Sequence, residues 1–170
     1  MIAALIMGRK GSTGLPGKNT MPVLGRPLAE YALLAARHAK RVDRTYLTTD
    51  DERLMELGTR LGARIIERPS NLCTSQALGE DVYRHAHSVV TAEAEREQTS
   101  LEQVALLMCN AATVLASQID EAAAVLDANP EYDSVVTCSC MNMWSPLRAR
   151  REDEDGLLQP FVPFETFGDP

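Results

Sequence analysis

Short apolar runs alternate with longer amphipathic stretches along the whole chain. Several of the runs are apolar at consecutive positions, as in strands of a parallel sheet that is covered on both faces. The apolar runs at residues 2–7 and 103–108 predict strands, and further strands are predicted at residues 44–49, 63–67 and 134–139.

The amphipathic stretches between these runs predict helices. Leu54 and Leu57 recur at helical spacing; Asp50 is the expected N-cap of their helix, and Gly62 its expected end. Further helices are predicted at residues 27–40, 79–96 and 118–128. Ser117 is the expected N-cap of the helix at 118–128. This alternation predicts a three-layer α/β/α sandwich around a mostly parallel, Rossmann-like sheet, with ligands at the carboxyl ends of the strands.

The first predicted strand ends in a loop rich in glycine and positive charge. Its glycines and cations are Gly8, Arg9, Lys10, Gly11, Gly14, Gly17 and Lys18. Glycine lets backbone N–H groups converge on an anion without Cβ clashes, and cations neutralise that anion. The loop is therefore predicted to bind phosphate, the alternative being a solvated surface loop. It is not a P-loop, because Asn19 follows Lys18 and has no hydroxyl, and the glycine spacing does not fit the dinucleotide fingerprint.

Composition excludes several classes of function. The length of 170 residues fits one domain, and the net charge of -7 argues against nonspecific binding to nucleic acid or to an anionic membrane. The run at residues 2–7 is too short to span a membrane and follows no basic segment, so neither an anchor nor a signal peptide is expected. The cysteines lack metal-ligand spacing and are expected to be free thiols in a reducing cytoplasm.

The glycine-rich loop resembles the signature of the CMP-sugar synthetases, the acylneuraminate cytidylyltransferase family, which reads roughly A-R-x-x-S-K-G-L-P-x-K-N. The residues in register are Arg9, Ser12, Gly14, Leu15, Pro16, Lys18 and Asn19. Further stretches similar to family motifs are Thr48-Thr49-Asp50-Asp51, Arg68-Pro69 with Leu72 and Ala77, Ser134-Val135-Val136-Thr137, and Ser145-Pro146-Leu147-Arg148. The resemblance covers nearly all of the chain and implies a sheet of the nucleotide-diphospho-sugar transferase type.

The activity implied by this resemblance is transfer of CMP from CTP to a sugar acid, with release of pyrophosphate and with Mg²⁺ as cofactor. Arg9 and Lys18 are the expected catalytic residues, because they can neutralise charge on the phosphates. The other expected contacts are the backbone of Lys10, Gly11, Ser12 and Gly14, the side chain of Asn19, a cytosine site framed by Arg68, Ala77 and Gly79, and Asn110 at the acceptor substrate. A surface ion pair with Glu67 or a nearby acid is the alternative role for Arg68, and helix capping is the preferred role for Asp50.

Several positions depart from the family pattern: Thr13 replaces the family lysine, and Cys73, Ser75, Gln76 and Gly79 do not match. Two departures matter most. The family's fourth strand runs into L-L-Q-P-T-S-P-L-R, which holds the sugar acid, whereas Met108 replaces the glutamine here and Val114 replaces the arginine. A cation that could pair bidentately with a carboxylate is therefore missing from this loop. The family's metal-binding aspartates lie beyond the part that matches this chain, so the metal ligands stay unassigned. Two alternatives remain open: a same-fold nucleotidyltransferase with another nucleotide or acceptor, and a non-catalytic nucleotide-binding domain.

The chain changes character after Cys140. Residues 1–140 are expected to form the nucleotide-binding α/β core, and residues 141–170 an extension that contains Phe161, Phe164 and Phe167. On the residues alone, these rings are expected either to pack on their own domain or to form a dimer contact. The family resemblance favours a dimerisation segment and a homodimer.

Overall fold

A computed structural model of the chain describes residues 1–11, 14–74, 76–138 and 149–162. The chain divides into two compact units, Met1–Val135 and Val136–Pro170. No helix among the described residues is long and apolar enough to cross a membrane.

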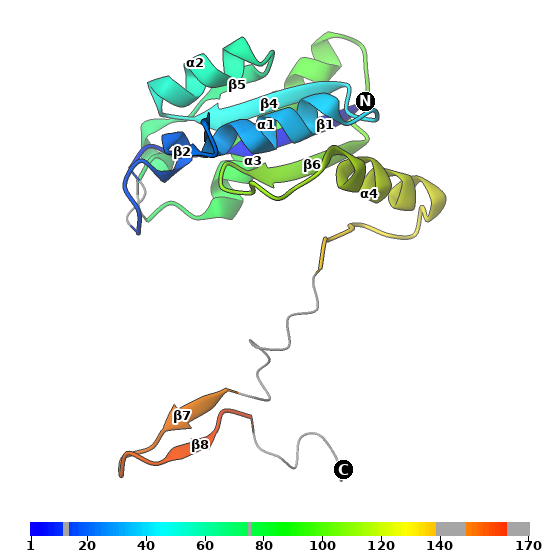
Figure 1. Ribbon diagram of the computed structural model, residues 1–170. Coiled ribbons are helices and arrows are strands. Elements are labelled where there is room, and N and C mark those ends of the chain that lie inside the picture. The colour runs from blue at the N-terminus through cyan, green and yellow to red at the C-terminus, as the bar shows by residue number, and fades with distance from the viewer. Residues whose placement is uncertain (12–13, 75, 139–148, 163–170) are drawn as a thin grey trace. The chain divides into compact units, whose positions relative to one another are not determined.

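The first unit is built on a four-stranded parallel sheet with the order β5-β4-β1-β6 (Figure 1). Its strands are β1 (Ile2–Met7), β4 (Arg44–Thr49), β5 (Arg64–Glu67) and β6 (Gln103–Met108). Strand β1 lies inside the sheet, between β4 and β6. Its side chains alternate between two apolar cores: Ala4 and Ile6 face one side, Ala3 and Leu5 face the other, and all four are fully buried. Such two-sided burial is what the run of apolar residues predicts.

Helices cover both faces of this sheet, which confirms the predicted three-layer α/β/α architecture. The helices are α1 (Leu28–His38), α2 (Glu52–Arg60), α3 (Gly79–Arg96) and α4 (Ala116–Ala128). The core on one face joins the sheet to α1, α2 and α4, and the core on the other face joins it to α3. Short elements complete the first unit: 3-10 helices η1 (Lys18–Thr20) and η2 (Ser70–Leu72), and the hairpin of β2 (Pro22–Val23) with β3 (Arg26–Pro27).

The predicted fifth strand at residues 134–139 is wrong for the part of it that is described. Residues 134–138 form no regular structure, and Val136 is 75% exposed, while Ser139 lies outside the described residues. Strand propensity is expressed only where a partner strand supplies hydrogen bonds and a surface to pack on. The Ser-Val-Val-Thr stretch has the propensity but pairs with no other described strand.

Two predicted helix caps are also corrected. Asp51, not Asp50, caps α2, because its Oδ1 accepts the backbone N–H of Arg53 at 3.0 Å. Helix α4 begins at Ala116, so Ser117 lies inside it and does not cap it. The first error arises because two neighbouring aspartates are equally good caps by composition, and the backbone path decides between them. The second arises because the N-cap position of α4 is held by Leu115, whose N–H donates to the Gln118 side chain at 2.9 Å.

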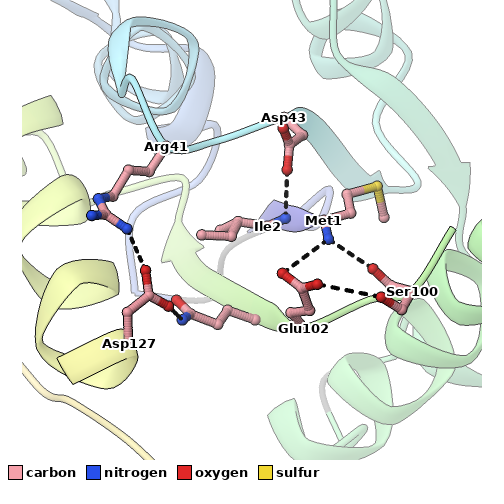
Figure 2. A network of polar contacts seen from close by, with 8 residues as sticks. Met1, Ile2, Arg41, Asp43, Ser100, Glu102 and Asp127 are labelled. Atoms are coloured by element: carbon pink, nitrogen blue, oxygen red, sulfur yellow. Dashed lines mark hydrogen bonds and ion pairs between the residues drawn. The ribbon is translucent and has the colours of Figure 1, made fainter. Parts of the chain in front are cut away.

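At the amino ends of the strands, polar contacts hold the start of β1 (Figure 2). The N-terminal ammonium group of Met1 donates to the Ser100 carbonyl oxygen at 2.7 Å and pairs with Glu102 at 3.3 Å. The N–H of Ile2 donates to the Asp43 carboxylate at 2.7 Å. Asp43 directly precedes β4, so this bond connects the amino ends of two neighbouring strands.

The described part of the second unit contains one antiparallel hairpin, β7 (Arg150–Glu152) with β8 (Leu158–Pro160). Asp153 holds its turn, since its carboxylate accepts the N–H groups of Asp155 at 3.1 Å and Leu157 at 2.8 Å. These bonds, together with one from the Gln159 side chain, lower the pKa of Asp153; the Gln159 bond has the largest effect.

Gly8, directly after β1, gives a test of the packing between β1 and β6. A Cβ at this position would lie 2.4 Å from the Sγ of buried Cys109, closer than such atoms can approach. Gly8→Ala is expected to lower the free energy of unfolding by about 1–3 kcal/mol, measured by urea denaturation. Gly14→Ala is the control, because among the described atoms a Cβ there meets nothing within 4 Å. Adding Cys109→Ala to Gly8→Ala should restore part of the loss; no restoration would contradict this packing argument.

Candidate functional site

The candidate site lies at the carboxyl ends of the parallel strands. Strand β1 leads into the glycine-rich loop, β4 into Asp50, β5 into Arg68 and β6 into Asn110. Since all four strands run in the same direction, these exits share one edge of the sheet. Strand order also reverses beside β1, where loops diverge and ligands of such sheets bind.

Arg68 is buried at this edge, with 7% of its surface exposed. Its Nη2 donates to the carbonyl oxygens of Gly8 and Thr48, both at 3.1 Å. Burial lowers the pKa of the Arg68 guanidinium, and the nearby Asp50 charge opposes this shift. The alternative of a surface ion pair with Glu67 is therefore wrong: Arg68 connects the ends of β1 and β4 from inside.

The start of the glycine-rich loop is held from two sides. The carbonyl oxygen of Arg9 accepts a hydrogen bond from Asn19 Nδ2 at 3.4 Å, and the N–H of Lys10 donates to Asp50 Oδ1 at 2.7 Å. These two groups belong to the same peptide unit. The backbone where the loop leaves β1 is thus fixed by side chains from η1 and from the end of β4.

A small pocket opens beside this peptide unit. Its lining residues are Arg9, Gly11, Gly17, Lys18, Asn19, Thr20 and Asp51. Gly11 and Gly17 have φ angles of 72° and 69°, in the left-handed region that favours glycine. The structure therefore gathers two cations, two glycine turns and a buried asparagine around one pocket.

The other predicted site residues that the structure describes are not in the lining of this pocket. Lys10 and Gly14 are exposed, and Ser12 lies outside the described residues. Buried Arg68 does not line the pocket, nor do half-buried Ala77, exposed Gly79 at the start of α3, or exposed Asn110 in the turn after β6.

Sequence reasoning missed Asp51 and Thr20, which line the pocket, and the contact of Asp50 with the loop. The available signal was the position of both aspartates at the end of a strand that neighbours β1 in a parallel sheet. That signal identifies the edge of the sheet but does not say which carboxylate turns toward the loop.

The loop after β6 differs from the family pattern in its packing as well. Val114 is partly buried against the core shared with α1, α2 and α4. Cys109 is fully covered, and burial raises the pKa of its thiol to about 12, so the sulfur is neutral at physiological pH. Neither residue supplies charge to a ligand.

Carboxylates near the pocket are few in the described part of the chain. No group of three or more histidine, cysteine, aspartate or glutamate side chains there could hold a metal ion. Asp51 is the described carboxylate in the pocket lining, and Mg²⁺ is commonly bound by one or two carboxylates together with substrate phosphates and water. The described donor set therefore fits a metal that arrives with a phosphate ligand.

Similar proteins were found by sequence and by structure. The profile of a family described as cytidylyltransferase matches residues 3–137. The chain is 29% identical over 156 residues to an N-acylneuraminate cytidylyltransferase of Escherichia coli O18:K1:H7, covering 92% of this chain and 35% of that protein. It is 30% identical over 90 residues to a pseudaminic acid cytidylyltransferase of Campylobacter jejuni, covering 52% of this chain and 39% of that protein. The chain thus spans little more than a third of the length of these relatives.

Solved structures share the fold at lower sequence identity. A CMP:2-keto-3-deoxy-manno-octonic acid synthetase complexed with CTP matches with a TM-score of 0.60 and 17% identity, covering 76% of this chain and 48% of that one. A Mycobacterium tuberculosis H37Rv protein in complex with manganese matches with a TM-score of 0.52 and 16% identity, covering 75% of this chain and 60% of that one. The parallel sheet, the loop after β1 and the sequence match over residues 3–137 agree, and the chain belongs to the cytidylyltransferase family.

Proposed function

We propose that this chain is the nucleotide-binding part of an enzyme that transfers CMP from CTP to a sugar acid and releases pyrophosphate. The observation that carries the proposal is the pocket at the end of β1, where Arg9 and Lys18 lie beside the glycine turns at Gly11 and Gly17. The similarity of residues 3–137 to the cytidylyltransferases supports CTP as the nucleotide.

The reaction asks the protein for positioning and charge neutralisation. A hydroxyl oxygen of the acceptor attacks the α-phosphorus of CTP, the bond to the bridging oxygen breaks, pyrophosphate leaves, and the hydroxyl proton passes to solvent. Arg9 and Lys18 would offset negative charge on the phosphates, and the N–H groups of the loop would hold their oxygens. Asp51 would hold Mg²⁺ that arrives with the nucleotide, and the bound metal would supply further neutralisation of phosphate charge.

Roles for the remaining site residues come from the family resemblance. Arg68, Ala77 and Gly79 would frame the cytosine, and Asn110 would contact the acceptor. Ser12 and Gly14 would complete the loop around the phosphates. A cytoplasmic location suits the described cysteines, which are free thiols and would persist in a reducing compartment.

The acceptor is the part of the proposal that the sequence departure affects most. Val114 stands where the family pattern has an arginine, and it packs against the core instead of carrying charge. A panel of acceptors should therefore include neutral sugars beside sugar acids.

Binding of CTP is the first test of the proposal. Titration calorimetry with CTP, ATP and GTP, each with and without Mg²⁺, should give selective binding of CTP that strengthens with the metal. Release of pyrophosphate from CTP in the presence of a sugar acid would establish transfer. Equal binding of all three nucleotides would favour a relative with another nucleotide, and CTP binding without turnover a non-catalytic domain.

Lys18→Ala tests the charge of the pocket. Loss of a charge-assisted contact with phosphate removes about 1.5–3 kcal/mol, so CTP should bind at least tenfold more weakly while the melting temperature stays close to that of the wild type. Lys40→Ala is the matched control, because Lys40 is exposed just after the end of α1, lies outside the pocket and carries the same charge. Unchanged CTP affinity in Lys18→Ala would refute the assignment of this loop to phosphate.

The segment 141–170 is proposed to dimerise the chain. Its described hairpin leaves Leu158 70% exposed and Phe161 61% exposed, and a lone two-stranded hairpin is only marginally stable in water. The family-like stretch at residues 145–148, Phe164 and Phe167 lie outside the described residues.

A double variant, Leu158→Ser with Phe161→Ser, tests this dimer. The wild type is expected to be a dimer in size-exclusion chromatography with light scattering, and the variant a monomer at the same concentration. Leu24→Ser is the control, since Leu24 is 94% exposed but lies in the first unit. A monomeric wild type, or a variant that stays dimeric, would contradict the assignment.

A further inference from the structure

We propose that Asp50 is a positioning residue that fixes the Arg9–Lys10 peptide of the glycine-rich loop in the orientation that binds phosphate. The proposal deepens the proposed function and rests on it, because the loop is assigned there to the triphosphate. It gives Asp50 a role that the N-cap prediction did not contain.

The first observation is the pair of bonds on one peptide unit. Asp50 Oδ1 accepts the N–H of Lys10 at 2.7 Å, while Asn19 Nδ2 donates to the carbonyl oxygen of Arg9 at 3.4 Å. A peptide unit held at both its donor and its acceptor cannot rotate without breaking one of these bonds. The direction in which the Arg9 side chain leaves the backbone is thereby restricted.

The second observation is the place of this peptide in the chain. It lies between Gly8, whose carbonyl oxygen is held by Arg68, and Gly11, which turns the chain with a φ of 72°. Arg9 and Gly11 both line the pocket. A rotation of the peptide between them would move a cation and a glycine turn together.

The third observation concerns the charge of Asp50. A free carboxylate beside a triphosphate would repel it, but the Asp50 carboxylate faces an N–H donor and lies close enough to the buried Arg68 guanidinium to stabilise its charge. Burial is the main cause of the raised pKa of the Cys73 thiol on the neighbouring loop, and the Asp50 charge raises it further. The Arg68 cation therefore compensates part of the Asp50 charge.

Asp43 provides a matched control, because it directly precedes β4 and Asp50 directly follows β4. Asp43 Oδ2 accepts the N–H of Ile2 at 2.7 Å (Figure 2). Asp50 makes the same kind of bond to Lys10, in the loop that follows the other end of β1. Asp43→Ala and Asp50→Ala each remove one exposed carboxylate bond to a backbone N–H. Only the second removes it next to the pocket.

The experiment compares Asp50→Ala, Asp50→Asn and Asp43→Ala with the wild type in CTP titration calorimetry with Mg²⁺. Asp50→Ala should bind CTP about tenfold more weakly, a loss that corresponds to about 1.4 kcal/mol. Asp43→Ala should bind CTP like the wild type, although its melting temperature should fall by about as much as that of Asp50→Ala. Asp50→Asn should bind within about threefold of the wild type, because its side-chain oxygen can still accept the Lys10 N–H.

Three results would overturn the proposal. Tighter binding by Asp50→Ala would mean that the carboxylate competes with phosphate for the Lys10 N–H. Equal losses in Asp50→Ala and Asp43→Ala would reduce Asp50 to a general contribution to stability. Equal losses in Asp50→Asn and Asp50→Ala would show that charge, and not the hydrogen bond, is what the loop requires.

Amide hydrogen exchange in the nucleotide-free protein separates this proposal from the proposed function. The Lys10 amide should exchange at least tenfold faster in Asp50→Ala than in the wild type and stay protected in Asp43→Ala. If the wild type binds no CTP, the proposed function fails, and with it the phosphate role of Asp50. Exchange at Lys10 then still decides whether Asp50 holds the loop.

Discussion

The arrangement of the site depends on one buried cation at the carboxyl edge of the sheet. A guanidinium that leaves water loses strong hydration, so its burial is tolerated only where acceptors are already in place. Arg68 finds them in the carbonyl oxygens of Gly8 and Thr48. The same contact sets the ends of β1 and β4 side by side, at the point where the glycine-rich loop and Asp50 leave the sheet. The bond between Asp50 and the Lys10 N–H lies just beyond this edge.

The layers of the fold could be predicted from sequence because their signals are local. The strands predicted at residues 2–7, 44–49 and 103–108 coincide with β1, β4 and β6, and the helix predicted at 79–96 coincides with α3. Continuous apolar runs and helical spacing record how many faces of an element are buried, and this property does not depend on the identity of its partner. The glycine-rich loop was likewise visible, since both its glycines and its cations lie within one short stretch.

Contacts between distant segments could not be predicted in the same way. Asp50 and Asp51 are chemically identical neighbours, yet one holds the loop and the other caps α2. Arg68 is charged, and nothing in its local sequence indicates that it will be buried. Its burial depends on the carbonyl oxygens of Gly8 and Thr48, which are far away in the sequence. The stretch 134–138 fails in the opposite sense, because it has strand propensity without a described partner strand. In each case the outcome is set by residues far away in the sequence.

Acidic residues at the edge of a site for a polyanion require a physical reason. Asp51 faces the first N–H groups of α2, where the helix dipole favours a negative charge. Asp50 faces a loop N–H and the buried Arg68 guanidinium. Both carboxylates thus accept bonds from backbone donors, although Asp51 also lines the pocket. The two cations Arg9 and Lys18 outnumber Asp51 in that lining, so the potential there can be positive although the whole chain carries a charge of -7. On this argument the carboxylates set the shape of the loop and the cations set its affinity, and replacing either kind of residue should change a different property of nucleotide binding.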